Sequence, residues 1–252
     1  MTDRIATFQA AKARHERLAV LTAYDYPTAR LLDESGVDAV LVGDSLGMVV
    51  LGYPDTTQVT MADMLHHTRA VARAVQRALV IADLPFGSDA TPARTVGDAR
   101  LLLAAGAHAV KLEGGSTHLA HYAALAAASI PVMAHIGMQP QRVRIEGGYH
   151  IKGKTAEQAS ALLEDAVAVE KAGAFGLLLE LVVPEVAHAI TQRVGIPTIG
   201  IGAGADCDGQ VLVLHDVIGL FPWFKPKFAT QRADVAAEIR RAAEDFVRGV
   251  KK

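Results

Sequence analysis

The sequence contains a single cysteine, Cys207, among its 252 residues. One cysteine cannot form an intrachain disulfide or a zinc site built on several thiolates. Long apolar runs are also missing, since none approaches the roughly 18 residues that a membrane-spanning helix needs. Residues 1–17 lack the apolar core of a signal peptide. These absences predict a cytoplasmic protein with no membrane contact.

An excess of charge of either sign is missing as well. Lysine and arginine number 25 against 27 acidic residues, so the formal net charge is −2. Nucleic acids and anionic membranes select a basic surface, so neither is an expected partner. With 51% hydrophobic and 21% charged residues, the composition is that of a globular protein with a large core. An enzyme acting on small molecules is the expected class.

Linkers, repeats and low-complexity segments are absent, and short apolar runs recur along the chain. Such runs, separated mostly by segments with helical periodicity, are typical of buried parallel strands. Together they predict a single (β/α)8 TIM barrel over residues 1–252, with an additional N-terminal helix at 2–13. A doubly wound open sheet is the alternative, because strand patterning alone does not exclude it. The predicted strands are 18–22, 39–42, 79–82, 109–112, 132–135, 176–179, 198–201 and 211–214.

Helices are predicted from apolar spacing together with start and stop signals. Thr95 and Asp98 have the spacing of a capping box, which indicates a helix start. Residues 137–154 are long for a loop, basic and glycine-containing, which is typical of a lid. The predicted helices end near residue 35 and then cover 61–76, 96–105, 117–128, 156–172, 184–194 and 232–250.

Four acidic residues stand where predicted strands end: Asp44, Asp83, Glu113 and Glu180. Catalytic groups of such barrels lie at the carboxyl ends of the strands. The first three follow consecutive strands, and oxygen ligands from neighbouring strands favour a hard cation such as Mg²⁺. Any one of these acids could equally cap the next helix. Capping does not account for the whole set.

Lys111 lies two residues before Glu113, so both side chains face the same side of the strand. A lysine inside a barrel needs a partner, and we expect a substrate carboxylate, with a purely structural ion pair as the alternative. Ser45 follows Asp44 and could hydrogen-bond an anion. His135 ends the fifth predicted strand, where it could contact a substrate or a carboxylate, although a structural role is as common there.

Glu180 ends the sixth predicted strand among apolar neighbours in 177–183. A carboxyl group in such surroundings has a raised pKa and can act as a general base. The alternative is a salt bridge to a lysine of the predicted lid.

Eight short segments match the sequence motifs of one protein family, and they occur in the same order as in that family. They are Thr-Ala-Tyr-Asp at 22–25, Gly-Asp-Ser-Leu-Gly-Met at 43–48, His-Thr-Arg-Ala-Val at 67–71, Asp-Leu-Pro-Phe at 83–86, Val-Lys-Leu-Glu-Gly-Gly at 110–115, Gly-Ile-Gly-Ala-Gly at 200–204, Asp-Gly-Gln-Val-Leu at 208–212 and Pro-Lys-Phe at 226–228. Spread over most of the chain, they closely resemble the ketopantoate hydroxymethyltransferase family.

This resemblance implies a (β/α)8 barrel that binds Mg²⁺ and α-ketoisovalerate, takes a hydroxymethyl group from 5,10-methylenetetrahydrofolate, and forms a homo-oligomer, usually a decamer. Glu180 resembles the family's proton acceptor. Asp44 and Asp83 resemble direct Mg²⁺ ligands, and Glu113 belongs to the same metal site. Ser45 and Lys111 resemble the family's substrate contacts. With the strand-end residues considered above, the predicted substrate-binding set is Asp44, Ser45, Asp83, Lys111 and His135.

Two other functions remain open. The predicted transfer would proceed through a Mg²⁺-stabilised enolate, and a Mg²⁺-dependent 2-oxoacid lyase of the isocitrate lyase type also holds an enolate with acids at strand ends. Such lyases generally use a cysteine in a Lys-Lys-Cys-Gly-His-type loop, and Cys207 lacks that setting. A ligand-binding barrel without catalysis is the second possibility, which the intact set of acids and Lys111 disfavours.

Overall fold

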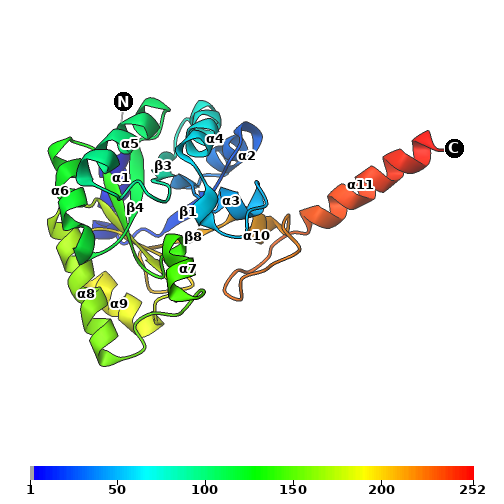
Figure 1. Ribbon diagram of the computed structural model, residues 1–252. Coiled ribbons are helices and arrows are strands. Elements are labelled where there is room, and N and C mark those ends of the chain that lie inside the picture. The colour runs from blue at the N-terminus through cyan, green and yellow to red at the C-terminus, as the bar shows by residue number, and fades with distance from the viewer. Residues whose placement is uncertain (1–2) are drawn as a thin grey trace.

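Eight parallel strands close into a barrel in the computed structural model, which describes residues 3–252 (Figure 1). Each strand pairs with the next along the chain, and the last pairs with the first. The predicted (β/α)8 barrel is confirmed, and the open sheet is wrong. The strands are β1 (Leu18–Thr22), β2 (Ala39–Val42), β3 (Leu79–Asp83), β4 (Ala109–Glu113), β5 (Val132–Gly137), β6 (Gly176–Glu180), β7 (Thr198–Ile201) and β8 (Gly209–Leu212).

Strand β8 lies two residues earlier than the predicted 211–214. Leu214 instead begins helix α10 (Leu214–Ile218), and its N–H donates to Thr22 Oγ1 over 3.0 Å. Gly209 pairs with Leu18 of β1, and a Cβ at Gly209 would lie 2.4 Å from the Leu18 carbonyl oxygen. Only glycine allows this approach, so an apolar pattern could not locate the start of the strand.

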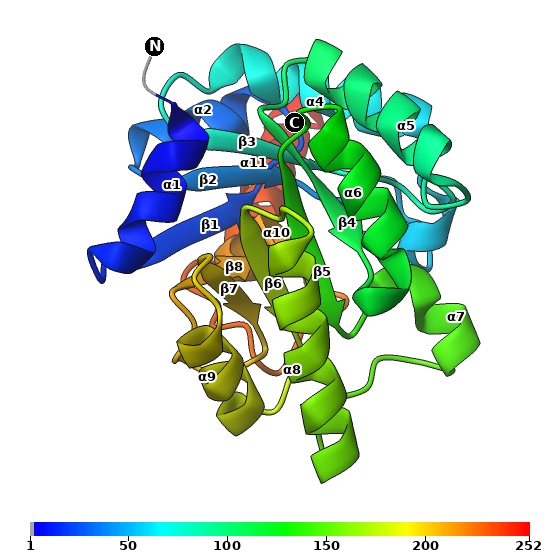
Figure 2. The same ribbon diagram turned by 90° about the vertical axis from the view of Figure 1, so that its left-hand side faces the viewer.

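The longer helices after β1 to β6 lie outside the strands, as Figure 2 shows for α5, α6, α8 and α9. Most begin within a few residues of their predicted positions. They are α2 (Tyr26–Glu34), α4 (Met61–Ala74), α5 (Pro92–Ala104), α6 (Leu119–Ala127), α8 (Ala156–Lys171) and α9 (Pro184–Arg193). Short helices and 3₁₀ turns lie in the loops: α3 (Leu46–Val49), α7 (Val143–Glu146), η1 (Thr56–Gln58), η2 (Ser116–His118) and η3 (Pro140–Arg142).

The capping box predicted at Thr95 is wrong. Helix α5 begins at Pro92, and Thr91 caps it by accepting from the Arg94 N–H at 3.2 Å. Proline is favoured in the first helical turn, which explains the earlier start. Thr95 lies inside the helix, where its hydroxyl donates to the Ser88 carbonyl at 2.8 Å. A capping box does occur at the start of α4, between Thr60 and Asp63.

Helix α1 (Arg4–Ala13) covers the amino-terminal end of the barrel. Arg4 donates to the Ala78 carbonyl just before β3, and Lys12 forms a 2.8 Å ion pair with Asp208 just before β8. The Phe8 ring packs edge-on against Phe175 at a centroid distance of 6.0 Å. One end of the barrel is therefore closed, which leaves the carboxyl end for ligands.

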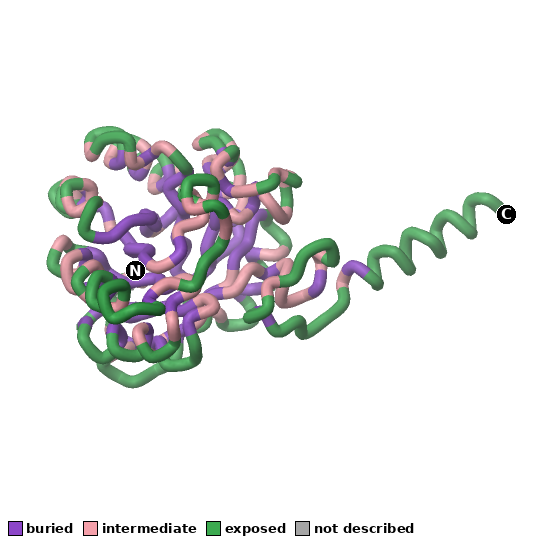
Figure 3. The backbone as a smooth tube through the Cα atoms, turned by 60° about the horizontal axis from the view of Figure 1, so that its bottom comes forward, coloured by how far each residue is buried: buried purple, intermediate pink, exposed green. Residues whose placement is uncertain are grey.

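The buried apolar residues form two clusters. One fills the barrel interior and includes Val20, Ile81, Leu178 and Val211. The larger one lies between the strands and the outer helices. Figure 3 shows the buried chain concentrated in the barrel. Successive residues of each strand point alternately into the barrel interior and towards the outer helices, as expected for a barrel of this type.

Helix α11 (Val235–Val250) projects away from the barrel (Figures 1 and 3). Its spacing places Ile239, Phe246 and Val250 along one side, and their exposed fractions are 54%, 73% and 68%. The predicted helix at 232–250 is confirmed, but its separation from the barrel was not predicted. None of the helices in residues 3–252 is both long and apolar enough to cross a membrane.

Candidate active site

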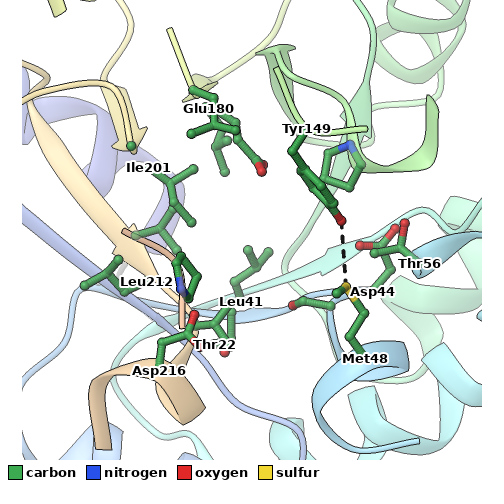
Figure 4. Close-up of a pocket in the computed structure, with 18 of the residues that line it drawn as sticks. Thr22, Leu41, Asp44, Met48, Thr56, Tyr149, Glu180, Ile201, Leu212 and Asp216 are labelled. Atoms are coloured by element: carbon green, nitrogen blue, oxygen red, sulfur yellow. Dashed lines mark hydrogen bonds between the residues drawn. The ribbon is translucent and has the colours of Figure 1, made fainter. Parts of the chain in front are cut away.

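Every predicted site residue lines one cavity of about 620 Å³ at the carboxyl ends of the strands (Figure 4). These residues are Asp44, Ser45, Asp83, Lys111, Glu113, His135 and Glu180. Strand register explains the convergence, because Asp83 pairs with Lys111 and Glu113 pairs with His135 on adjacent strands. The barrel thus gathers groups that are far apart in sequence.

Lys111 is the cation at the centre of this group and is only 4% exposed. Its Nζ lies 3.0 Å from Asp83 Oδ1, 3.9 Å from Glu113 Oε1 and 3.1 Å from His135 Nδ1. Burial alone would lower the pKa of Lys111, but the charges of Asp83, Glu113 and Asp44 outweigh that effect and raise it. The ammonium group is therefore charged and held in place by acids on both sides.

Asp44 and Asp83 lie next to each other. The Asp44 N–H donates to Asp83 Oδ2 over 3.0 Å, so Asp83 is not a helix cap. Burial, together with the charge of Asp83, raises the pKa of Asp44 to about 7. Burial also raises the pKa of Glu113 well above its ordinary value. Ionising all three carboxyl groups would place more negative charge here than Lys111 balances, which is why protons are held on Asp44 and Glu113.

A divalent cation could replace these protons and allow the acids to ionise. Among the residues that the structure describes, no three His, Cys, Asp or Glu side chains form a ready-made metal cage. Mg²⁺ does not need one, because it usually binds through one or two carboxylates and keeps its other positions for water or substrate oxygens. Asp44 and Asp83 suit that role, and Glu113 Oε1, buried without a hydrogen bond, faces Lys111 beside them.

His135 connects the acids to Glu180. Burial and the nearby Lys111 lower the pKa of His135 well below its ordinary value, so the ring is neutral. Its Nδ1 accepts from Lys111, which leaves the proton on Nε2. That nitrogen lies 3.3 Å from Glu180 Oε2. The pair does not form a hydrogen bond in this geometry, but a small rotation of either side chain would let His135 Nε2 donate to the Glu180 carboxylate.

Glu180 ends β6 at the cavity wall. Burial raises its pKa to about 7, which is the direction predicted from its apolar neighbours. The alternative salt bridge to a lid lysine is not formed, because Lys152 pairs with Glu146 instead. A carboxyl group with this pKa can accept and return a proton near neutral pH.

Polar side chains that the sequence did not indicate complete the site. Gln141 donates from Nε2 to Asp44 Oδ2 at 2.8 Å, and its backbone N–H donates to Glu113 Oε2 at 3.1 Å. The Tyr24 hydroxyl lies 2.9 Å from Ser45 Oγ. Gln141 belongs to the predicted lid, so the unusual length of that loop was the one feature of the sequence that pointed to additional site residues there.

The predicted lid, 137–154, lies over the cavity mouth. Arg144 forms a 2.8 Å ion pair with Asp55, and the Tyr149 hydroxyl donates to Met48 Sδ at 3.7 Å (Figure 4). Pro140, Tyr149 and Ile151 line the cavity. Opening and closing of this segment stay a prediction.

Comparisons with known proteins agree with the resemblance. The sequence model of the family described as ketopantoate hydroxymethyltransferase matches residues 3–252. A 3-methyl-2-oxobutanoate hydroxymethyltransferase of Clostridium novyi (strain NT) is 50% identical over 252 residues, covering 99% of this chain and 92% of that protein. One of Pyrobaculum islandicum is 56% identical over 233 residues, covering 92% of this chain and 89% of that protein.

Solved structures show the same barrel in more distant proteins. A phosphonopyruvate hydrolase in complex with oxalate and Mg²⁺ superposes with a TM-score of 0.67 at 17% identity, covering 95% of this chain and 88% of the other. Barrels of lyase type share the fold, so the fold alone does not separate the predicted transferase from its lyase rival. The matched length and the identity of the relatives do: the chain is an enzyme that belongs to the ketopantoate hydroxymethyltransferase family.

Proposed function

We propose that this enzyme transfers a hydroxymethyl group from 5,10-methylenetetrahydrofolate to α-ketoisovalerate, giving ketopantoate and tetrahydrofolate in pantothenate and coenzyme A biosynthesis. The observation that carries the proposal is the pairing of Glu180, a base with a pKa near 7, with a buried ammonium and a set of acids in one cavity. Membership of the family supplies the substrates.

Each site residue has a separate role in the proposed reaction. Lys111 and Ser45 hold the ketoacid carboxylate, so that the C3 hydrogen faces Glu180. Glu180 accepts this proton, and His135 Nε2, 3.3 Å away, is close enough to donate to its carboxylate after a small rotation. Mg²⁺ held by Asp44 and Asp83, with Glu113 nearby, would supply Lewis-acid stabilisation of negative charge on the substrate oxygens.

Atom balance defines the remaining steps. The hydroxymethyl oxygen of ketopantoate comes from neither organic substrate, so the reaction must consume one water. This water releases the methylene carbon from the folate at the oxidation level of formaldehyde, which leaves tetrahydrofolate. The C3 carbanion forms the new carbon–carbon bond to that carbon. The resulting alkoxide takes a proton, and protonated Glu180 is the group in the cavity placed to return it.

The first half of the reaction can be tested alone. Proton NMR of α-ketoisovalerate in D₂O should show loss of the C3–H signal that needs both protein and Mg²⁺ and is abolished by EDTA. Ketopantoate should then form when methylenetetrahydrofolate is added. Absence of exchange with folded, metal-loaded protein would contradict the proposal and favour the lyase or a barrel without catalysis.

The same proposal includes a homo-oligomer, a decamer by family resemblance. The exposed apolar side of α11 supports self-association. Cytoplasmic location and the lack of a nucleic-acid partner stay predictions from the sequence.

A further inference from the structure

The residues assigned to the ketoacid line only one side of the cavity. Asp44, Ser45, Lys111 and Glu180 surround the position of the small ketoacid. A cavity of about 620 Å³ is of the size that holds a drug-sized ligand. The remaining wall is formed by β8 and the segment after it: Leu212, Val213, Asp216, Phe221, Phe224 and Phe228. This part of the cavity is free for the second substrate.

Asp216 is the acid in this otherwise apolar wall. It lies in α10, and Figure 4 shows it across the cavity from Glu180 and apart from Asp44. Within residues 3–252 its carboxylate forms no hydrogen bond and no ion pair, and burial is the sole cause that raises its pKa, to about 6. Lys227 lines the same cavity but does not pair with it. Water reaches this partly buried carboxylate, so a ligand that fills the cavity must offer donors in place of the water it displaces.

The reduced pterin ring of a folate has matching chemistry. One edge carries a ring N–H and an amino group that point the same way, and the two oxygens of an ionised carboxylate can accept both. The pyrimidine half of the ring has flat faces, which suit contact with aromatic side chains such as Phe221 and Phe224. Lys227 is exposed at the mouth, where the anionic glutamyl tail would leave.

We propose that Asp216 anchors the pterin ring of the folate co-substrate by accepting hydrogen bonds from its N3–H and 2-amino groups, against the wall of Phe221, Phe224 and Val213. This inference rests on the proposed function and adds to it the subsite and the group that recognises the folate. Asp216 binds the co-substrate, whereas Glu180 acts on the ketoacid.

Tetrahydrofolate binding tests the proposal directly. Trp223 is the single tryptophan of the chain and its ring lies 5.2 Å from that of Phe221, so its fluorescence should report ligand at this wall. Asp216→Asn should weaken tetrahydrofolate binding by about 10- to 100-fold, the range for a lost hydrogen bond to a charged group. Calorimetry checks the affinity independently. Asp206→Asn, which changes an exposed acid outside the cavity, is the matched control and should bind as the unaltered protein does.

A partial reaction separates this outcome from damage to the other substrate site. Metal-dependent C3 exchange of α-ketoisovalerate needs no folate, so Asp216→Asn should slow it far less than it weakens folate binding. Unaltered affinity for tetrahydrofolate in Asp216→Asn would overturn the pterin anchor and leave the proposed function standing. Failure of the unaltered enzyme to bind tetrahydrofolate or to form ketopantoate would overturn both.

A ligand pair makes the test independent of how the variant folds. The unaltered protein should bind 6-methyltetrahydropterin at least about tenfold more tightly than 6-methyltetrahydrolumazine, in which a carbonyl replaces the 2-amino donor. Equal affinity for the two would contradict the role of Asp216.

Discussion

At the scale of single residues, the acid–base assignment depends on Glu180. Replacing it with glutamine keeps the shape of the side chain but removes the proton acceptor. We expect Glu180→Gln to reduce turnover and C3 exchange by about 10²- to 10⁴-fold, the usual contribution of a positioned general base. The affinities for Mg²⁺ and for the ketoacid, measured by calorimetry, should change little.

Glu185→Gln on α9 is the matched control, because Glu185 is an exposed glutamate five residues further on. It should retain full activity. Turnover close to that of the unaltered enzyme in Glu180→Gln would remove Glu180 from the role of base.

Asp83 offers a second test at this scale. Asp83→Asn retains the size of the side chain but removes charge next to Asp44 and Lys111. Mg²⁺-dependent binding of α-ketoisovalerate should weaken by at least about tenfold, as for other disturbed metal sites. A titration with and without EDTA measures this, and equal affinity would place the metal elsewhere.

The acids that line the cavity could be predicted from sequence because each ends an apolar run. A strand end is visible in the pattern, and parallel topology brings all such ends to one rim. Gln141 and Asp216 could not be found in this way. They lie on the short helical segments η3 and α10, after β5 and β8, which are too short to show a periodicity, and their roles depend on the tertiary path of the chain there.

At the scale of elements, α11 makes the clearest prediction. A helix whose apolar residues are exposed needs a partner to bury them, and a second copy of the chain is the partner proposed. Phe246→Asp should therefore reduce the mass of the assembly measured by size exclusion with light scattering.

Glu244→Gln on the same helix is the control, because Glu244 is an exposed acid paired with Arg248 and not part of the apolar side. An assembly of unaltered mass in Phe246→Asp would show that α11 does not hold it together.

The apolar pattern predicted the position of a helix or strand well, except where a single proline, cap residue or glycine moved the end of the element. The start of α5 was misplaced because Pro92 and Thr91 outweigh the apolar spacing, and β8 was misplaced because Gly209 reads as a turn. The projection of α11 depends on where the chain leaves the barrel after α10, which local sequence does not encode.

At the scale of the whole molecule, the buried acids link stability to pH and metal. Burial and Asp83 raise the pKa of Asp44 from 3.8 to about 7, so between these values the folded state holds more protons than the unfolded chain. The contribution of this group to the free energy of unfolding therefore falls as pH rises through that window. Glu113 acts in the same direction.

A bound cation competes with those protons, so its binding should be stronger where the acids are ionised. Mg²⁺ should raise Tm more at pH 8 than at pH 6, measured by thermal unfolding against EDTA. An equal rise at both pH values would mean that the cation does not bind at Asp44.

The pairing of β8 with β1 also affects how the chain is made. Leu18 has its partner in Gly209, so the first strand has one unsatisfied edge until almost the whole chain has been synthesised. An unpaired strand edge is prone to bind other chains. Helix α1 depends on the same late event, because Lys12 finds Asp208 only then. The first strand can pair with β2 early in synthesis, but it cannot complete its native contacts until residues 208–212 have left the ribosome.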